Sequence, residues 1–211
     1  MATNHVYSEG LKEQLRAMAA GRLDGLDLDS VDRWVIGNLK DAPAFFRQLA
    51  VLIPEDCILY FEGCEIDPEM TRFYERNRAA NAVSVVRDTV FPVPDTHHVA
   101  MSPAVIKELI GMLGQRPIAK CFYHVKAYRE EKLLFTFHDA FDGSDLLVSE
   151  QVPEENVQAF STALGGTCRR EKNVNRRSPE NMRRMLELFE NPQKWRINWP
   201  WWKKALYFWK R

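Results

Sequence analysis

Apolar residues recur at every second position along Ile118–Glu150, and this stretch organises the predicted fold. The alternation breaks at Arg129–Lys132 and at Asp142–Ser144, which predicts three short strands joined by two tight turns. The pair Asp142-Gly143 favours the positive φ angles of a type I′ hairpin turn. We therefore expect an antiparallel meander in the middle of a sheet, with helices packed on one of its faces.

Helix signals stand on both sides of this meander. An N-cap residue followed by a proline in the first turn predicts helix starts at Asp41-Ala42-Pro43, Asp67-Pro68 and Ser102-Pro103. Further helices are expected over 8–21, 31–39 and 178–191 and after Pro153, and further strands over 57–61, 97–101 and 167–174. The pattern predicts one α+β domain over 1–211, built on a mostly antiparallel sheet.

The register of the first hairpin decides where the histidines point. With a two-residue turn at 130–131, an unbroken ladder places Tyr123 opposite His138 and His124 opposite Phe137. His124 and His138 then lie on opposite faces of the sheet and cannot share a metal ion. The same ladder puts three apolar side chains on one face: Leu133, Phe135 and Phe137. No metal site is expected.

Composition indicates a globular protein, with 45% hydrophobic and 27% charged residues. The four cysteines have no CxxC spacing and are too sparse for a disulfide scaffold, which indicates a reducing compartment. No signal pattern opens the sequence and no run approaches the ~18–20 apolar residues of a membrane span, so we expect a cytoplasmic protein. Phosphate-binding and nucleophile motifs such as GxGxxG and GxSxG are missing, and no cofactor is expected.

The best candidates for chemistry lie between a predicted buried strand and the helix that begins at Asp67. Glu62 and Glu65 form a carboxylate pair that, together with His138, has the residue types of a general acid and base in a hydrolase. Acids at helix starts are also common for dipole reasons alone. Cys64 stands among these acids, and their charge opposes the low thiol pKa that a nucleophile needs.

The end of the chain has the least ordinary composition. Residues 167–211 carry thirteen bases and four acids, a net charge of +9, whereas the whole chain is neutral. Five of the six tryptophans fall within 194–211, together with six bases and no acid. A basic aromatic helix docked on the body is the first interpretation of 194–211. Membrane-surface binding, stacking on nucleic acid and docking in the groove of a protein partner are the others.

The missing catalytic motifs, the uneven charge along the chain and its basic, tryptophan-rich end predict a non-enzymatic protein. We expect it to bind another macromolecule, in the manner of an adaptor or immunity protein. The expected partner is another protein, and the expected binding residues combine bases with tryptophans: Arg169, Arg170, Arg176, Arg177, Trp199, Trp201, Lys203 and Lys204. Two alternatives stay open. One is the hydrolase of Glu62, Glu65 and His138, and the other is a membrane or nucleic-acid surface formed by 169–211.

Overall fold

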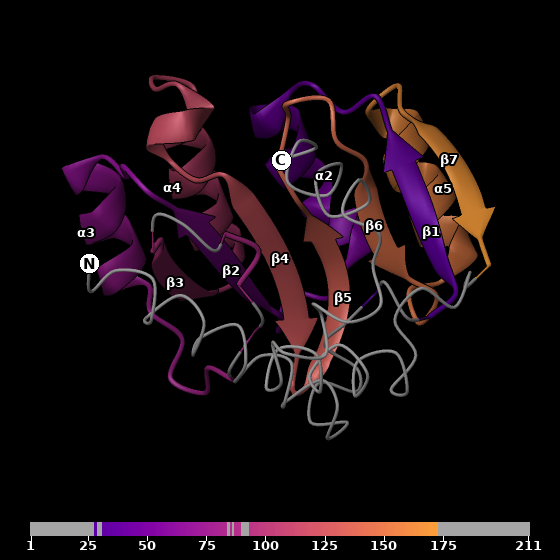
Figure 1. The fold of residues 1–211 in the computed structure, drawn as a ribbon, viewed down its shortest axis with the longest axis horizontal. Helices are drawn as coiled ribbons and strands as arrows, with labels where there is room; N and C mark the ends of the chain where they lie inside the picture. Colours follow the sequence, from indigo (N-terminus) through magenta and orange to yellow (C-terminus); the bar gives the residue numbers. More distant parts are fainter. Residues whose placement is uncertain (1–27, 29–30, 84, 86, 90–92, 173–211) are drawn as a thin grey trace, which may run out of the picture. The chain divides into compact units, whose positions relative to one another are not determined.

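Seven antiparallel strands form a single sheet in the order β3-β2-β4-β5-β6-β1-β7 (Figure 1). The computed structural model describes residues 28, 31–83, 85, 87–89 and 93–172, all within one compact unit, 24–175. The strands are β1 (Arg33–Gly37), β2 (Ile58–Gly63), β3 (Asp95–Ala100), β4 (His124–Arg129), β5 (Lys132–Phe137), β6 (Leu146–Ser149) and β7 (Thr167–Glu171). The predicted α+β class is confirmed.

The meander β4–β5–β6 lies in the middle of the sheet, as the alternating pattern predicts (Figure 1). The sheet as a whole is not a simple meander, because β1 is inserted between β6 and β7 although it comes first in the chain. The predictions for 8–21, 178–191 and 194–211 lie outside the described residues. The prediction of a single domain over 1–211 includes these segments and stays a prediction.

Four α-helices begin where the capping signals predict. They are α2 (Ala42–Leu52), α3 (Pro68–Arg76), α4 (Pro103–Leu113) and α5 (Glu154–Ala163). The side chains of Asp41, Asp67 and Ser102 accept hydrogen bonds from backbone N–H groups in the first turns of α2, α3 and α4. Helix α5 follows Pro153 and has no side-chain cap. The proline at each start costs no hydrogen bond, because these N–H groups have no partner within the helix.

Among the described residues, one face of the sheet and the helices α2, α3, α4 and α5 enclose an apolar core. Its centre is an aromatic cluster in which the Phe45 ring from α2 meets Phe135 and Phe137 from β5 and Phe160 from α5, at centroid distances of 5.4–5.9 Å. Figure 1 shows α2 and α5 behind the sheet in that view. The polar groups of the site described below lie on the other face of the sheet, beside apolar residues such as Leu133.

The expected helix over 31–39 is wrong, because Arg33–Gly37 is strand β1. Trp34 and Ile36 enter the apolar core, and each residue of the strand has a partner on β7. Five residues are too few to separate a period of 2 from a period of 3.6, and long-range pairing with β6 and β7 decides the outcome. The strand forms two ladders of hydrogen bonds in place of a helix of about two and a half turns.

The ladder between β4 and β5 is interrupted by a β-bulge, which the sequence analysis missed. Arg129 pairs with Lys132, so the predicted two-residue turn is confirmed. The register then shifts by one residue between Tyr128 and Ala127, and Val125 lies opposite Phe137. The prediction that Leu133 shares a face with Phe135 and Phe137 is therefore wrong. Leu134 joins these two rings in the core, and Leu133 pairs with Tyr128 on the other face.

The second connection is also longer than predicted. Strand β5 ends at Phe137 and β6 begins at Leu146, so residues 138–145 replace the expected two-residue turn. Gly143 has the positive φ of 82° that the pattern favours, but Asp142 does not, and Phe141 has a φ of 69°. The strained backbone at Phe141 is maintained because its ring packs on Phe45 and Phe137, at centroid distances of 5.5 and 4.9 Å.

Candidate functional site

A buried polar cluster lies on the face of the sheet opposite the aromatic core. Leu59 and Phe61 of β2 enter the core, so the alternating residues Tyr60 and Glu62 point to the other face. Pairing between β2 and β4 sets Lys126 opposite Tyr60 and His124 opposite Glu62. The four side chains are almost completely buried: Tyr60 1%, Glu62 0%, His124 4% and Lys126 4% exposed. Such a group of polar side chains is the first place to look for function.

The Glu62 carboxylate accepts three hydrogen bonds. The Tyr60 hydroxyl donates to Oε2 at 3.0 Å, the Asp88 N–H donates to Oε2 at 3.1 Å, and the Thr89 N–H donates to Oε1 at 2.5 Å. Burial, followed by the charge of Glu62, raises the pKa of Tyr60 far above its usual range, so the phenol stays a donor. Glu62 therefore ties residues 88–89 to β2, and its charge is already compensated by hydrogen bonds.

Lys126 is the cation of this cluster. Its Nζ lies 3.0 Å from Oδ2 of Asp88 and 5.9 Å from the centre of the Tyr60 ring. Asp88 thus contacts the sheet twice, through its backbone N–H to Glu62 and through its carboxylate to Lys126. A buried ion pair of this kind fixes geometry more than it adds stability, because both charges lose their hydration.

Each of the two ring nitrogens of His124 makes a hydrogen bond. Its Nε2 lies 2.9 Å from Oγ1 of Thr89, and its Nδ1 accepts the backbone N–H of Asp139 at 2.9 Å. Burial, and then the charge of nearby His138, lower the pKa of His124, which makes the neutral ring the dominant form near neutral pH. A neutral ring that accepts at Nδ1 carries its proton on Nε2. The proton on Nε2 is donated to Thr89.

Thr89, His124 and Asp139 contact one another in the same sequence as the nucleophile, histidine and acid of a hydrolase triad. The His124 proton, however, is on the nitrogen that faces Thr89. In such a triad Nδ1–H donates to the carboxylate, and Nε2 takes the proton of the nucleophile. Here Nδ1 is an acceptor, and it lies 3.6 Å from Oδ1 of Asp139. With its proton on Nε2, His124 cannot accept a proton from the Thr89 hydroxyl, so the arrangement in this structure is that of a structural hydrogen-bond network.

His124 and His138 lie on the same face of the sheet, which corrects the sequence-based expectation. Their rings stack with centroids 4.2 Å apart and an interplanar angle of 28°. The bulge between Ala127 and Tyr128 is the cause, because a shift of one residue turns every later side chain to the other face. The stated reason for excluding a shared metal ion is therefore wrong.

A different observation argues against a metal here. His124, His138 and Asp139 bring ligand atoms within 4.8 Å of one another. The Nδ1 lone pair of His124 is occupied by the Asp139 N–H, and two nearly parallel rings do not direct their nitrogens at one point. His138 and Asp139 alone offer two ligands, whereas a zinc site takes three or four from the protein. That the protein binds no metal stays a prediction, which metal analysis of the purified chain checks.

The other sequence candidates near Glu62 are not drawn into the cluster. The Glu65 carboxylate is exposed and accepts a hydrogen bond from Lys120 Nζ at 2.7 Å. Burial first, and then the charges of Glu62, Asp95 and Glu65, raise the pKa of the Cys64 thiol. The prediction that Cys64 is a poor nucleophile agrees with this direction. Burial raises the pKa of Cys57 to about 12 and that of Cys121 to about 11, so these thiols stay protonated.

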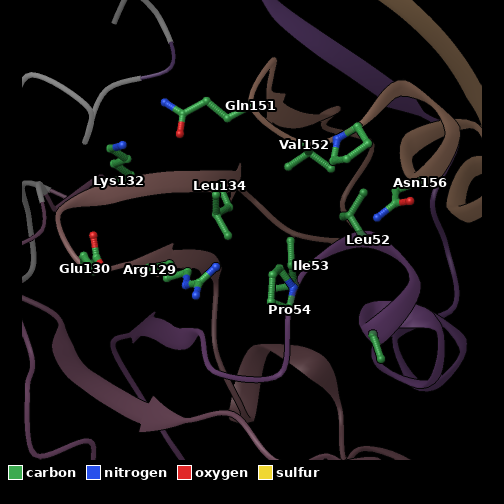
Figure 2. Close-up of a pocket in the computed structure, with 12 residues that line it drawn as sticks. Leu52, Ile53, Pro54, Arg129, Glu130, Lys132, Leu134, Gln151, Val152 and Asn156 are labelled. Carbon is green, nitrogen blue, oxygen red and sulfur yellow. The ribbon is translucent and has the colours of Figure 1, made fainter.

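A hollow of about 590 Å³ lies where β4, β5, α2 and α5 approach one another (Figure 2). Its walls are apolar where they are deepest and polar around the edge. The apolar lining consists of Ala50, Leu52, Ile53, Pro54, Leu134, Val152 and Pro153, and the polar lining of Arg129, Glu130, Lys132, Gln151 and Asn156. None of the residues of the buried polar cluster lines it. The sequence gives no sign of this hollow, because its wall comes from three segments that are about 20 to 100 residues apart along the chain.

A second hollow of about 410 Å³ lies along α2 and α4. Phe46, Met101 and Ile106 form part of its apolar wall, and Arg47 and Lys107 stand at its edge. This hollow provides a matched control for experiments on the first one, because each has two cations beside an apolar wall.

Two of the predicted binding residues fall within the described part of the chain, on the edge strand β7. Arg169 contacts the carboxylates of Asp145 and Glu171, at 3.0 and 3.2 Å. Arg170 contacts Glu150 at 3.2 Å, and its guanidinium lies over the Trp34 ring. Both arginines thus pair with acids of the sheet and its loops. The other six lie outside the described residues: Arg176, Arg177, Trp199, Trp201, Lys203 and Lys204.

The sequence analysis missed Asp88, Thr89 and Lys126, which complete the buried cluster. A lysine between apolar residues of a strand, as in His124-Val-Lys126-Ala, was the available signal, since a lysine on a central strand requires a partner. The partner was not identifiable, because Asp88 lies in a segment with no regular pattern.

Comparison with protein-family models, curated proteins and solved structures finds no match for this chain. Among the residues that the structure describes, no helix has the length and apolarity needed to cross a membrane. The class that the fold defines is thus an α+β protein with a seven-stranded antiparallel sheet and helices on one face.

Proposed function

We propose that this protein works by binding another macromolecule, preferably another protein, and not by catalysis. The observation that carries the proposal is the state of Glu62, the strongest acid–base candidate in the sequence. Its two oxygens already accept three hydrogen bonds from Tyr60, Asp88 and Thr89. A general base needs a lone pair directed at a substrate that can reach it, whereas three of the about four acceptor sites of this fully buried carboxylate already accept hydrogen bonds within the protein.

Charge distribution supports the same proposal. Residues 167–211 carry a net charge of +9 in a chain of zero net charge, and a basic segment of this kind favours an acidic partner surface. Arg169 and Arg170 are partly neutralised by their acidic neighbours on the sheet. The proposed binding surface therefore depends more on Arg176, Arg177, Lys203 and Lys204 than on these two arginines.

The test is capture of a partner followed by reconstitution. The tagged full chain is cross-linked in its native host, captured and analysed by mass spectrometry, and the candidate partner is then purified and mixed with the chain. We expect a complex of defined stoichiometry in size-exclusion chromatography, weakened when Arg176, Arg177, Lys203 and Lys204 are changed to glutamate. A captured species that disappears on nuclease or detergent treatment would replace the protein partner by nucleic acid or membrane. A chain that forms no complex with any captured species would contradict the proposal.

A hydrolase is the second candidate, because Thr89, His124 and Asp139 stand in triad order. It requires the His124 proton to move from Nε2 to Nδ1, with loss of the bond from the Asp139 N–H. The test is labelling of the purified chain by a fluorophosphonate probe, compared with Thr89→Val and His124→Asn variants. Labelling at Thr89 that disappears in both variants would establish the hydrolase and displace the binding proposal. Absence of labelling leaves binding as the preferred function.

A further inference from the structure

We propose that the hollow between the end of α2, the β4–β5 turn and the start of α5 recognises a short extended segment of a protein partner. The segment carries one aliphatic side chain flanked by carboxylates. This inference rests on the proposed binding function and assigns it a surface that the sequence analysis did not consider.

The size of the hollow fits such a segment. Its volume of about 590 Å³ is roughly twenty times the ~30 Å³ that a water molecule occupies in the liquid. It also lies within the ~300–1,000 Å³ typical of ligand pockets. The deep part is formed by aliphatic residues and prolines, among them Ile53, Pro54, Leu134 and Val152, and it offers no polar partner (Figure 2). An aliphatic side chain placed there would lose its contact with water without leaving a polar group unsatisfied.

Three of the polar side chains at the edge are not engaged elsewhere in the described part of the chain. Within the part of the chain that the structure describes, Lys132, Gln151 and Asn156 make no side-chain hydrogen bond and no ion pair. Each side-chain amide offers two N–H donors and a carbonyl acceptor, which matches the backbone groups of an extended peptide. Charged side chains elsewhere in the described residues are often paired, as Arg116 is with Glu69 and Asp67. Lys132, Gln151 and Asn156 can therefore bind a ligand without first breaking a side-chain bond within the described residues.

The cations at the edge of the hollow favour carboxylates on either side of the aliphatic side chain in the bound segment. Arg129 and Lys132 stand on either side of the β4–β5 turn, and with Glu130 they give the residues that line the hollow one net positive charge; Glu131 of the same turn is not among the lining residues. Arg129 contacts Asp56 at 2.9 Å, and both side chains of this pair are more than half exposed. An exposed pair of this kind exchanges partners at little cost, so Arg129 remains available to an incoming carboxylate.

The lining disfavours nucleic acid as the occupant. The hollow has no aromatic side chain among its twelve lining residues, so it offers no surface on which a base could stack. Only two cations are present, whereas binding to a phosphate backbone depends on many. A peptide uses the apolar wall, the amides and the two cations together.

The experiment is a titration of the full isotope-labelled chain with two short peptides, followed by NMR. The probes are acetyl-Gly-Asp-Leu-Asp-Gly-amide and acetyl-Gly-Lys-Leu-Lys-Gly-amide, and the signals are the side-chain amides of Gln151 and Asn156. Two double variants are compared with the wild type. Arg129→Glu with Lys132→Glu reverses the charge of this hollow, and Arg47→Glu with Lys107→Glu does the same at the hollow along α2 and α4.

We expect the wild type and the Arg47/Lys107 variant to prefer the aspartate peptide by about fivefold or more, the scale of one exposed ion pair. The Arg129/Lys132 variant should instead prefer the lysine peptide. If neither peptide moves the two amide signals, or if the preference is the same in all three proteins, the inference is wrong. The inference is also wrong if the complex between the full chain and its captured partner protein survives the change of Arg129 and Lys132 to glutamate. The proposed binding function would then still stand. Peptide binding without any macromolecular complex would contradict the proposed function and leave the peptide site in place.

Discussion

Strand β4 connects two regions that differ in the burial and pairing of their polar side chains. At its start, His124 and Lys126 belong to a buried cluster in which both side chains have partners on other segments. Where it ends, Arg129 borders a hollow whose neighbouring lysine and amides make no bond within the described residues. This difference in burial and pairing indicates a different role for each region. Polar groups that are buried and paired maintain the fold, and polar groups that are exposed and unpaired beside an apolar wall are suited to a ligand.

The comparison predicts that the largest loss of stability comes from Glu62. Replacing it by alanine leaves three donors without an acceptor: the Tyr60 hydroxyl and the N–H groups of Asp88 and Thr89. At ~1–3 kcal/mol for each buried unsatisfied group, and allowing for relaxation, we expect the free energy of unfolding to fall by about 3–5 kcal/mol. Urea denaturation measures this change. Glu130→Gln in the exposed turn is the control, and equal unfolding midpoints for the two variants would refute the assignment of Glu62 to the fold.

The histidine stack gives the next largest expected effect and tests the bulge directly. His124→Ala removes two hydrogen bonds and should cost about 1–3 kcal/mol, whereas exposed His138→Ala should cost less. Because the rings stack at 4.2 Å, a double-mutant cycle should give a coupling energy of about 0.5 kcal/mol or more. In the unbulged register the rings lie on opposite faces, and the coupling would vanish. A coupling indistinguishable from zero at pH 7.5 therefore contradicts the observed register.

Acid should weaken the fold through the buried histidines. Burial is the largest cause that lowers the pKa of His97, His98 and His124 below the ordinary histidine value of about 6.5. A lowered pKa means that the unfolded chain binds these protons more readily than the folded chain, so stability rises with pH in this range. The stabilising contribution is complete above pH 6.5 and is lost as the pH falls below it. Urea midpoints at pH 7.5, 6.5 and 5.5 should decrease in that order, with a smaller decrease in His98→Asn.

The smallest expected effect on stability belongs to the hollow. Arg129→Glu with Lys132→Glu replaces exposed side chains, and the pair that it breaks, Arg129 with Asp56, is also exposed. Such a pair contributes ~0–1 kcal/mol, so the free energy of unfolding should change by no more than about 1 kcal/mol. Circular dichroism during thermal unfolding checks this. A loss comparable to that of Glu62→Ala would mean that the edge of the hollow maintains the fold and is not reserved for a ligand.

Local signals in the sequence were sufficient for the main elements of the fold. Asp41, Asp67 and Ser102 cap helices because a side-chain oxygen satisfies N–H groups that no helix can satisfy internally. The two-residue turn at 130–131 follows from the abrupt break in an apolar alternation, and Glu130 adopts the positive φ of 54° that the turn requires. Each of these features depends on a few neighbouring residues, and this is why the chain alone predicts them.

The position of the β-bulge, in contrast, is decided by packing over the whole sheet. In an unbroken ladder, Phe135 and Phe137 would share a face with Lys126 and His124, away from the helices. The shift of one residue moves both rings into the core against Phe45, where each gains ~1.5–3 kcal/mol from burial. The run Leu133-Leu134-Phe135 does not alternate, so nothing local shows where the extra residue lies. The same shift carried His138 to His124 and decided the composition of the site.

The sequence by itself determined the fold class, the capped helices, the first hairpin turn and the central position of the meander. Only the tertiary structure decided the pairing of β1 between β6 and β7, the partners of Glu62 about 26 residues away, and the hollow formed by three separate segments. The physical reason is the range of the interactions. Caps and turns are satisfied within a few residues, whereas strand register and buried hydrogen bonds are chosen by the balance of burial over the entire sheet.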